Sequence, residues 1–166
     1  RQQGWETVEV DLPSPQLVLS AHYAIAGYEL VRYQDLRFKT LAKHGKNVQA
    51  IIKRARGYSD RDYRIALAAR DASVGSAWRL FDDIDLLALP TTPTVAPEPG
   101  TETFRLDDRT VDAVSGAIWY TALFNDTGLP AVSVPFMGQR GLPIGIQLVS
   151  QWGQDNLLLD VAEQIN

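Results

Sequence analysis

Helix-like and strand-like patterns alternate along this chain, and that alternation is what most restricts its possible folds. After Ser14-Pro15, apolar side chains recur at steps of three and four residues, which predicts a helix with proline at its first position and one face on a core. Ser59 and Asp62 have the spacing of a capping box at the start of another helix. Three helices are therefore expected in the first half of the chain: from Pro15 to about Tyr33, around residues 48–55 with a stop at Gly57, and from Asp60 to Phe81.

Four strands are predicted from period-two alternation or from short apolar runs: residues 5–12, 86–89, 131–136 and 144–150. Residues 91–108 are rich in proline and have no periodicity, so a long surface connection is expected there. A further helix should run from a Thr110 cap to Leu123, and a last one should begin at Asp155. Strands separated by helices favour an α/β fold, with helices packed on a mixed sheet whose last two strands form a hairpin. No repeat or linker divides the chain, so one domain, or part of one, is expected.

The composition excludes several classes of function. Sixteen basic and 20 acidic residues give a net charge of −4, so general binding to nucleic acid is not expected. There is no cysteine and there are only two histidines, His22 and His44, so we expect neither a metal site nor a cofactor held by thiolates. No segment resembles a membrane span or a secretion signal, which predicts a soluble, cytoplasmic protein.

The ends of the chain suggest that it is a piece of something longer. It begins with Arg1 rather than methionine, and Asn166 ends it inside an amphipathic run. We therefore expect a fragment of a larger protein.

Arg70 is the most informative single residue of the sequence. On the helix that begins at Asp60, it falls on the same face as Tyr63, Leu67 and Val74. A charge near a core must be paired or must reach a polar pocket. One interpretation is structural: Arg70 forms an ion pair, or its aliphatic part extends along the helix so that the guanidinium reaches the helix edge. The other is functional: the guanidinium binds a carbonyl or carboxylate group of a substrate.

A basic stretch lies between Lys39 and Arg64, where eight basic residues accompany only Asp60 and Asp62. Such a stretch can dock RNA or an acidic partner, but no aromatic residues are interleaved with these cations in a recognition pattern. A solvated helix face is the simpler interpretation. The acidic residues among positions 82–85 lack the fixed ligand spacing of a calcium loop, so they are interpreted as a polar turn. His22 has no second metal ligand four residues later and is interpreted as a residue at the surface or at the boundary of a core.

The motifs of common nucleophiles are missing. The sequence has no Gly-x-Ser-x-Gly elbow, no Ser-x-x-Lys and no glycine-rich phosphate loop. All four lysines lie between Lys39 and Lys53, and no base is expected near the serines at 73, 76 and 115. The residues alone predict no catalytic apparatus.

An ordered series of short motifs resembles the C-terminal portion of amidase signature enzymes, from about residue 15 to the end. The series consists of Ala26-Gly27-Tyr28-Glu29, Arg70, residues 81–93 (FDDIDLLALPTTP), residues 125–135 (NDTGLPAVSVP) and residues 141–147 (GLPIGIQ). The resemblance implies an amide-bond hydrolase with a mixed sheet covered by helices. It also implies a Ser, a cis-peptide Ser and a Lys that share protons in an N-terminal portion without counterpart here. The chain would then supply strands and one wall of the acyl pocket.

The resemblance also implies where substrate binds. Arg70 stands 20 residues before Pro90, where members similar to the glutamine-using subunit of glutamyl-tRNA amidotransferase place an arginine for a substrate carboxylate. Those members have an acidic residue about ten positions before the Gly of the Gly-Leu-Pro motif, where this chain has Ala117-Ile118-Trp119, and this departure argues against free glutamine as substrate. We expect a small amide with an apolar or aromatic part, bound by five residues: Arg70, Ile118, Trp119, Phe124 and Tyr63.

Two alternatives remain open. The chain could be a non-catalytic fragment or subunit of a glutamyl-tRNA amidotransferase-type assembly, in which the basic stretch recruits RNA, or an inactive relative retained for assembly. The expected partners are the missing N-terminal portion and a small amide, with a homo-oligomer as a further possibility and no membrane.

Overall fold

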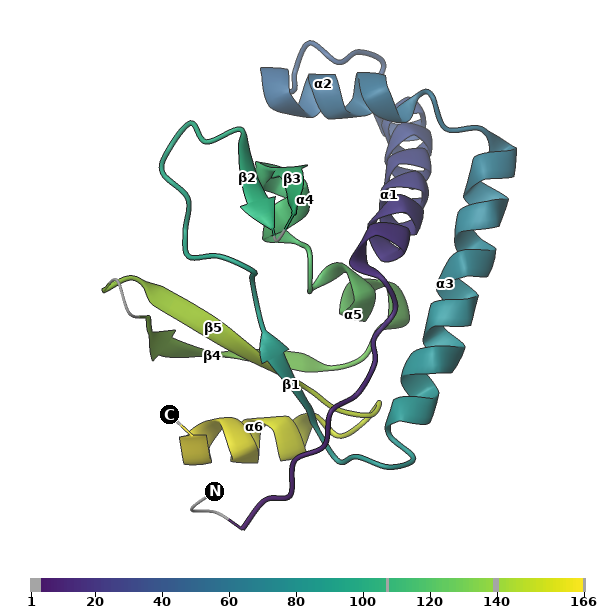
Figure 1. Cartoon of the computed structure of the whole chain (residues 1–166). Coiled ribbons are helices and arrows are strands. Elements are labelled where there is room, and N and C mark those ends of the chain that lie inside the picture. The colour runs from purple at the N-terminus through teal and green to yellow at the C-terminus, as the bar shows by residue number, and fades with distance from the viewer. Residues whose placement is uncertain (1–3, 107, 139–140, 166) are drawn as a thin grey trace.

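The computed structural model describes residues 4–106, 108–138 and 141–165. A helical layer comes first in the chain and a β-rich part follows it (Figure 1). In order, the elements are α1 (Pro15–Arg37), α2 (Lys46–Ala55), α3 (Asp60–Leu80), β1 (Leu87–Pro90), β2 (Thr103–Leu106), β3 (Arg109–Asp112), α4 (Ala113–Ala117), α5 (Ala122–Thr127), β4 (Ala131–Met137), β5 (Pro143–Val149) and α6 (Asp155–Ile165).

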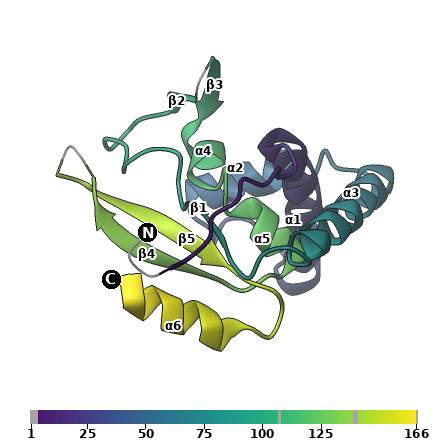
Figure 2. The same cartoon turned by 60° about the horizontal axis from the view of Figure 1, so that its bottom comes forward.

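The main sheet has the strand order β1-β5-β4, with both pairs antiparallel. Every second residue of a strand faces the same side, so α6 covers one face through Val134, Leu148 and Leu158 (Figure 2). On the opposite face, Leu87 and Val149 pack with Phe124 of α5 in the main core. Strands β2 and β3 form a separate two-stranded hairpin.

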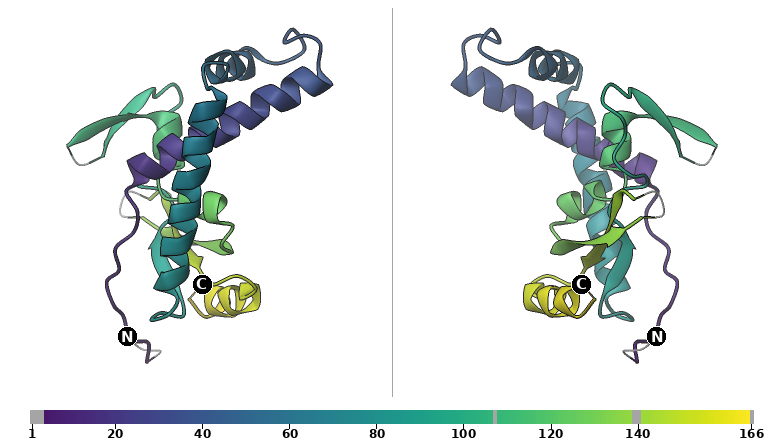
Figure 3. Two further views of the ribbon diagram at one scale, coloured as in Figure 1. Left: turned by 90° about the vertical axis from the view of Figure 1, so that its right-hand side faces the viewer. Right: turned by 90° about the vertical axis from the view of Figure 1, so that its left-hand side faces the viewer.

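Helices α1 and α3 pack against each other and against α5, and they cross when seen from the side (Figure 3). Ser59 and Asp62 form the predicted capping box at the start of α3, with the Ser59 hydroxyl accepting from the Asp62 N–H. The Ser59 hydroxyl also donates to the Asp62 carboxylate at 2.6 Å, and this bond, together with the one from the Ser59 N–H at 2.8 Å, lowers the pKa of Asp62. A cap of this kind contributes about 1 kcal/mol to helix stability.

Much of the predicted fold is confirmed. The helices that begin at Pro15, Asp60 and Asp155 are present, α2 ends before Gly57, and β4 and β5 form the expected hairpin. The α/β class is confirmed as well, although every strand pair within the described residues is antiparallel, so the mixed character of the predicted sheet is not seen in them.

The strand predicted at residues 5–12 is wrong. Residues 5–12 are extended but belong to no described sheet, because no strand lies beside them to complete a hydrogen-bonded ladder. Val10 and Leu12 nevertheless pack against the main core, which accounts for the alternating pattern.

The prediction for residues 91–123 is wrong in two respects. The connection is interrupted by the β2–β3 hairpin, and Thr110 lies in β3 instead of capping a helix. The helical part is split into α4 and α5, and Asp112 caps α4 by accepting from the Ser115 N–H at 3.0 Å.

Two apolar segments, residues 86–89 and 48–55, are less buried than their composition suggests. Strand β1 lies at an edge of the main sheet and is only partly buried, with Leu87 as its buried residue. On α2, Ile52 and Ala55 are buried as expected, whereas Val48 and Ile51 are exposed because the helix covers only the end of α1.

Candidate functional site

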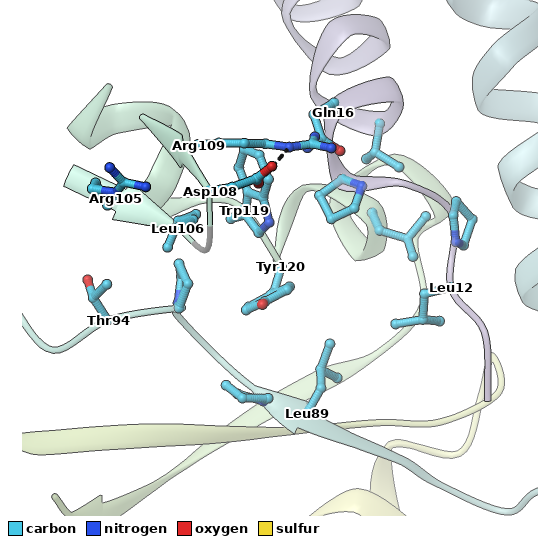
Figure 4. A pocket seen from close by; sticks show the side chains of 16 residues that line it. Leu12, Gln16, Leu89, Thr94, Arg105, Leu106, Asp108, Arg109, Trp119 and Tyr120 are labelled. Atoms are coloured by element: carbon cyan, nitrogen blue, oxygen red, sulfur yellow. Dashed lines mark ion pairs between the residues drawn. The ribbon is translucent and has the colours of Figure 1, made fainter. Parts of the chain in front are cut away.

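A hollow of about 700 Å³ lies where four separate segments meet. Its walls come from the segment that leads into α1, the end of β1 with the loop after it, the tip of the β2–β3 hairpin, and the link between α4 and α5 (Figure 4). Apolar side chains, among them Leu12, Leu89 and Trp119, form most of the interior, and Arg105 and Arg109 stand at the hairpin side. Polar and charged groups contribute nearly as much of the exposed lining as apolar ones, and apolar walls with polar anchors are the usual design of a small-ligand site.

Gln147 of β5 holds two walls of the hollow together. Its side chain is buried, and its Nε2 donates to the backbone carbonyls of Tyr120 at 3.2 Å and Pro90 at 3.4 Å. Tyr120 and Pro90 both line the hollow. The glutamine at the end of the Gly-Leu-Pro-Ile-Gly-Ile-Gln motif therefore positions the site, a role that the motif alone did not reveal.

Gly145 of the same motif permits close contact between the strands beside the hollow. Thr91 Oγ1 and Ser133 Oγ lie 2.6 Å apart in a hydrogen bond, and a Cβ atom at residue 145 would lie 2.6 Å from each oxygen. Only glycine fits there without displacing the two hydroxyl groups. The Thr91 N–H also donates to the Gly145 carbonyl at 2.8 Å, which extends the β1–β5 ladder toward the hollow.

The β2–β3 hairpin is anchored at its base. The ring of Phe104 lies directly over Gly116 of α4, where a Cβ atom would come within 1.9 Å of the ring. The Ala113 N–H donates to the Glu102 carbonyl at 2.8 Å, and the Asp112 carboxylate caps α4. Burial alone would raise the pKa of Asp112, but hydrogen bonds from Ser115 outweigh it and lower the pKa.

The five residues predicted to bind substrate do not all meet in one place. Trp119 lines the hollow, whereas Phe124 is buried in the main core and Ile118, partly buried, packs against that core. Tyr63 and Arg70 lie on α3, away from the hollow.

Tyr63 and Arg70 have local partners of their own. Tyr63 stacks on Tyr28 with 4.2 Å between ring centroids, and its hydroxyl donates to Glu29, which raises the pKa of Tyr63. Arg70 pairs with the adjacent Asp71 at 3.0 Å, and its side chain remains 37% exposed. Arg70 also borders a second hollow of about 610 Å³, formed largely by small side chains of α1 and α3.

His22 has a partner that the sequence did not indicate. Its Nδ1 lies 2.8 Å from Asp126 Oδ1, joining α1 to α5 across 104 positions of sequence. The hydrogen bond to Asp126 raises the pKa of His22 although partial burial opposes the shift. Asp126 belongs to the Asn-Asp-Thr-Gly-Leu-Pro motif, so part of that motif acts as a link between helices.

Two negative findings hold for the described part of the chain. It contains no group of three or more acidic, histidine or cysteine side chains that could hold a metal ion. None of its described helices is both long and apolar enough to cross a lipid bilayer.

The chain belongs to the amidase family, whose model matches residues 1–159. Among curated proteins, it is 31% identical to the A subunit of glutamyl-tRNA(Gln) amidotransferase from Caldanaerobacter subterraneus subsp. tengcongensis, covering 96% of this chain and 37% of that protein. The corresponding protein of Halorhodospira halophila is 32% identical, with 98% and 38% covered. The chain thus spans less than two-fifths of the length of these relatives.

Solved structures agree with this assignment. A crystal structure of an amidase superposes with a TM-score of 0.89 at 27% identity, over 99% of this chain and 38% of that protein. A 6-aminohexanoate cyclic dimer hydrolase superposes with a TM-score of 0.69 at 28% identity, over 92% and 34%. The family resemblance drawn from the motif series is therefore confirmed.

Proposed function

We propose that this chain is the C-terminal portion of an amidase that hydrolyses a small amide, and that it supplies one wall of the substrate pocket. The observation that carries the proposal is the hollow bordered by Trp119, which a family glutamine, Gln147, holds in shape. The serine pair and the lysine that cleave the bond would lie in the portion of the relatives that has no counterpart here. Arg70 and Tyr63 would then face that portion, which could complete a site around them.

What the described residues contain supports this division of labour between the two portions of the protein. The Thr91 and Ser133 hydroxyls bond to each other, and no described histidine, lysine or carboxylate contacts them. His22, the histidine with the altered pKa, is paired with Asp126 in a link between helices. The side chains around the hollow can bind and orient an amide, but they offer no paired nucleophile and base.

The test uses the complete protein that contains this chain, assayed on simple aryl amides. Replacing Trp119 with alanine removes aromatic surface from the hollow, and should raise KM for an aryl amide about tenfold, a loss of about 1.4 kcal/mol of binding. Trp5→Ala is the matched control, because Trp5 is exposed and does not line the hollow. Equal effects of the two substitutions, or no hydrolysis of any amide by the complete protein, would contradict the proposal.

A second function has one specific observation in its favour. The curated relatives named above are A subunits of glutamyl-tRNA(Gln) amidotransferase, so the complete protein could belong to a comparable assembly. The basic stretch from Lys39 to Arg64 would then contact RNA. Binding to tRNA that weakens steeply with added salt would support this role, because phosphate contacts release counterions, and a flat salt response would exclude it.

A further inference from the structure

Arg109 reaches across the mouth of the hollow. Its side chain extends from the tip of the hairpin toward Gln16 in the first turn of α1, while Arg105 lies on the outer side of the hairpin (Figure 4). Arg109 thus places a positive charge above an interior built mostly from apolar side chains. A ligand that fills the interior would have its outer end close to this guanidinium.

The hairpin is a firm support for this arginine. In the β2–β3 register, Arg109 pairs with Leu106, and the hairpin base is fixed by the contact of Phe104 with Gly116. A side chain mounted on an anchored hairpin loses less freedom when it binds than one on a loose loop. The position of Arg109 at the rim is therefore a property of the fold.

The charge partner described for Arg109 leaves most of its binding capacity available. Asp108 Oδ1 lies 3.6 Å from Arg109 Nε, which is longer than a charge-assisted hydrogen bond, and both side chains are more than half exposed. Exposed ion pairs of this kind are weak, so Asp108 does not hold the guanidinium firmly. Since Asp108 approaches Nε, the two terminal nitrogens of the guanidinium can meet a carboxylate in the paired geometry that arginine favours.

We propose that the hollow selects amides that combine an apolar or aromatic body with a carboxylate at the end remote from the amide, and that the Arg109 guanidinium binds this carboxylate. The proposal rests on the proposed function, because it assigns a substrate class to the same hollow. The aromatic body would lie among Trp119, Tyr120 and Leu89, and the carboxylate would compete with Asp108 for Arg109. Asp108 would then lower affinity for the anion and make recognition sensitive to salt.

Two probes of the same shape separate charge from packing. Terephthalamate carries a carboxylate opposite its amide, and terephthalamide carries a second neutral amide in the same place. Both are titrated into the full 166-residue chain, with binding followed through the NMR signal of the Trp119 indole. We expect terephthalamate to bind about tenfold more tightly at low salt, with the preference shrinking as the ionic strength rises.

Three substitutions test which side chains cause the preference for terephthalamate. Arg109→Gln should abolish the preference, Asp108→Asn should increase it, and Arg64→Gln, an exposed control outside the hollow, should leave it unchanged. Terephthalamide binding should be the same in all four proteins. Equal binding of the two probes to the wild-type chain, or a preference that survives Arg109→Gln, would contradict the proposal that Arg109 binds a substrate carboxylate. Neither result would contradict the proposal that the hollow binds substrate. If neither probe shifts the Trp119 signal, the hollow is not the substrate site and the proposed function loses its support too.

Discussion

Gln147 Nε2 donates to the backbone carbonyl of Tyr120 across 3.2 Å and so joins the central strand β5 to the α4–α5 link. This bond lies under the hollow, where a buried amide replaces water as the partner of two carbonyl groups. A family motif thereby acts on the shape of the site through the backbone and not through contact with a ligand.

Replacing Gln147 with leucine should lower the free energy of unfolding by about 1–3 kcal/mol, because the carbonyls of Tyr120 and Pro90 lose a buried donor. Urea denaturation measures the change. Gln164→Leu, on the exposed side of α6, should stay within about 0.5 kcal/mol of the wild-type value. Similar changes in the two variants would remove the special role of Gln147.

Gly145→Ala and Gly75→Ala should have opposite signs. At residue 145 the new methyl group meets the Thr91 and Ser133 hydroxyls at 2.6 Å, so unfolding should become easier by about 1–3 kcal/mol. At residue 75 a Cβ atom meets nothing within 4 Å inside helix α3, so alanine should stabilise the chain by up to about 1 kcal/mol. Thermal unfolding of both variants measures the two changes in stability. Stabilisation by Gly145→Ala would contradict the claim that a methyl group at residue 145 clashes with the Thr91 and Ser133 hydroxyls.

The His22–Asp126 pair predicts a pH dependence of stability. Because the folded state raises the pKa of His22 above its ordinary 6.5, the protonated form stabilises the fold. That contribution is fully present below pH 6.5 and is lost as the pH rises through the folded pKa. The unfolding free energy should therefore fall as the pH rises above 6.5, and His22→Gln should remove this part of the slope. An unchanged slope in His22→Gln would assign the dependence to other groups.

Arg70→Ala distinguishes the two interpretations of this arginine. Its ion pair with Asp71 is largely exposed, so its loss should cost no more than about 1 kcal/mol of stability. If Arg70 grips substrate in the complete protein, kcat/KM should fall at least tenfold, while Asp71→Ala, which breaks the same pair, should have little effect. Equal effects of the two variants on activity and on melting temperature would return Arg70 to a structural role.

Local signals predicted the elements that depend on local chemistry. Pro15 sets the start of α1, the Ser59–Asp62 box starts α3, and β4 and β5 are near enough in sequence to pair with each other. The extended segment at residues 5–12 has the pattern of a strand without a partner, and partners are decided by tertiary structure. The β2–β3 hairpin was missed because its anchor, Phe104 over Gly116, joins residues that carry no turn or strand signature.

The lining of the hollow was anticipated only in part, for the same reason. Trp119 was named as a substrate-binding residue and lines the hollow, but Arg109 belongs to a hairpin whose place beside the hollow only the fold reveals. The helical periodicity placed Arg70 on a core-facing line, yet the buried positions of α3 are Ala66 and Ala77, so this line lies to one side of the contact with α1. Small residues mark that contact because they let two long helices approach closely.

The most direct test of the central claim compares amide hydrolysis by the 166-residue chain with hydrolysis by the complete protein, at equal concentration and on the same aryl amide. The account predicts turnover by the complete protein and none above background by the chain alone, although the chain binds the substrate. Turnover by the chain alone would show that it carries its own bond-cleaving residues and would contradict the account.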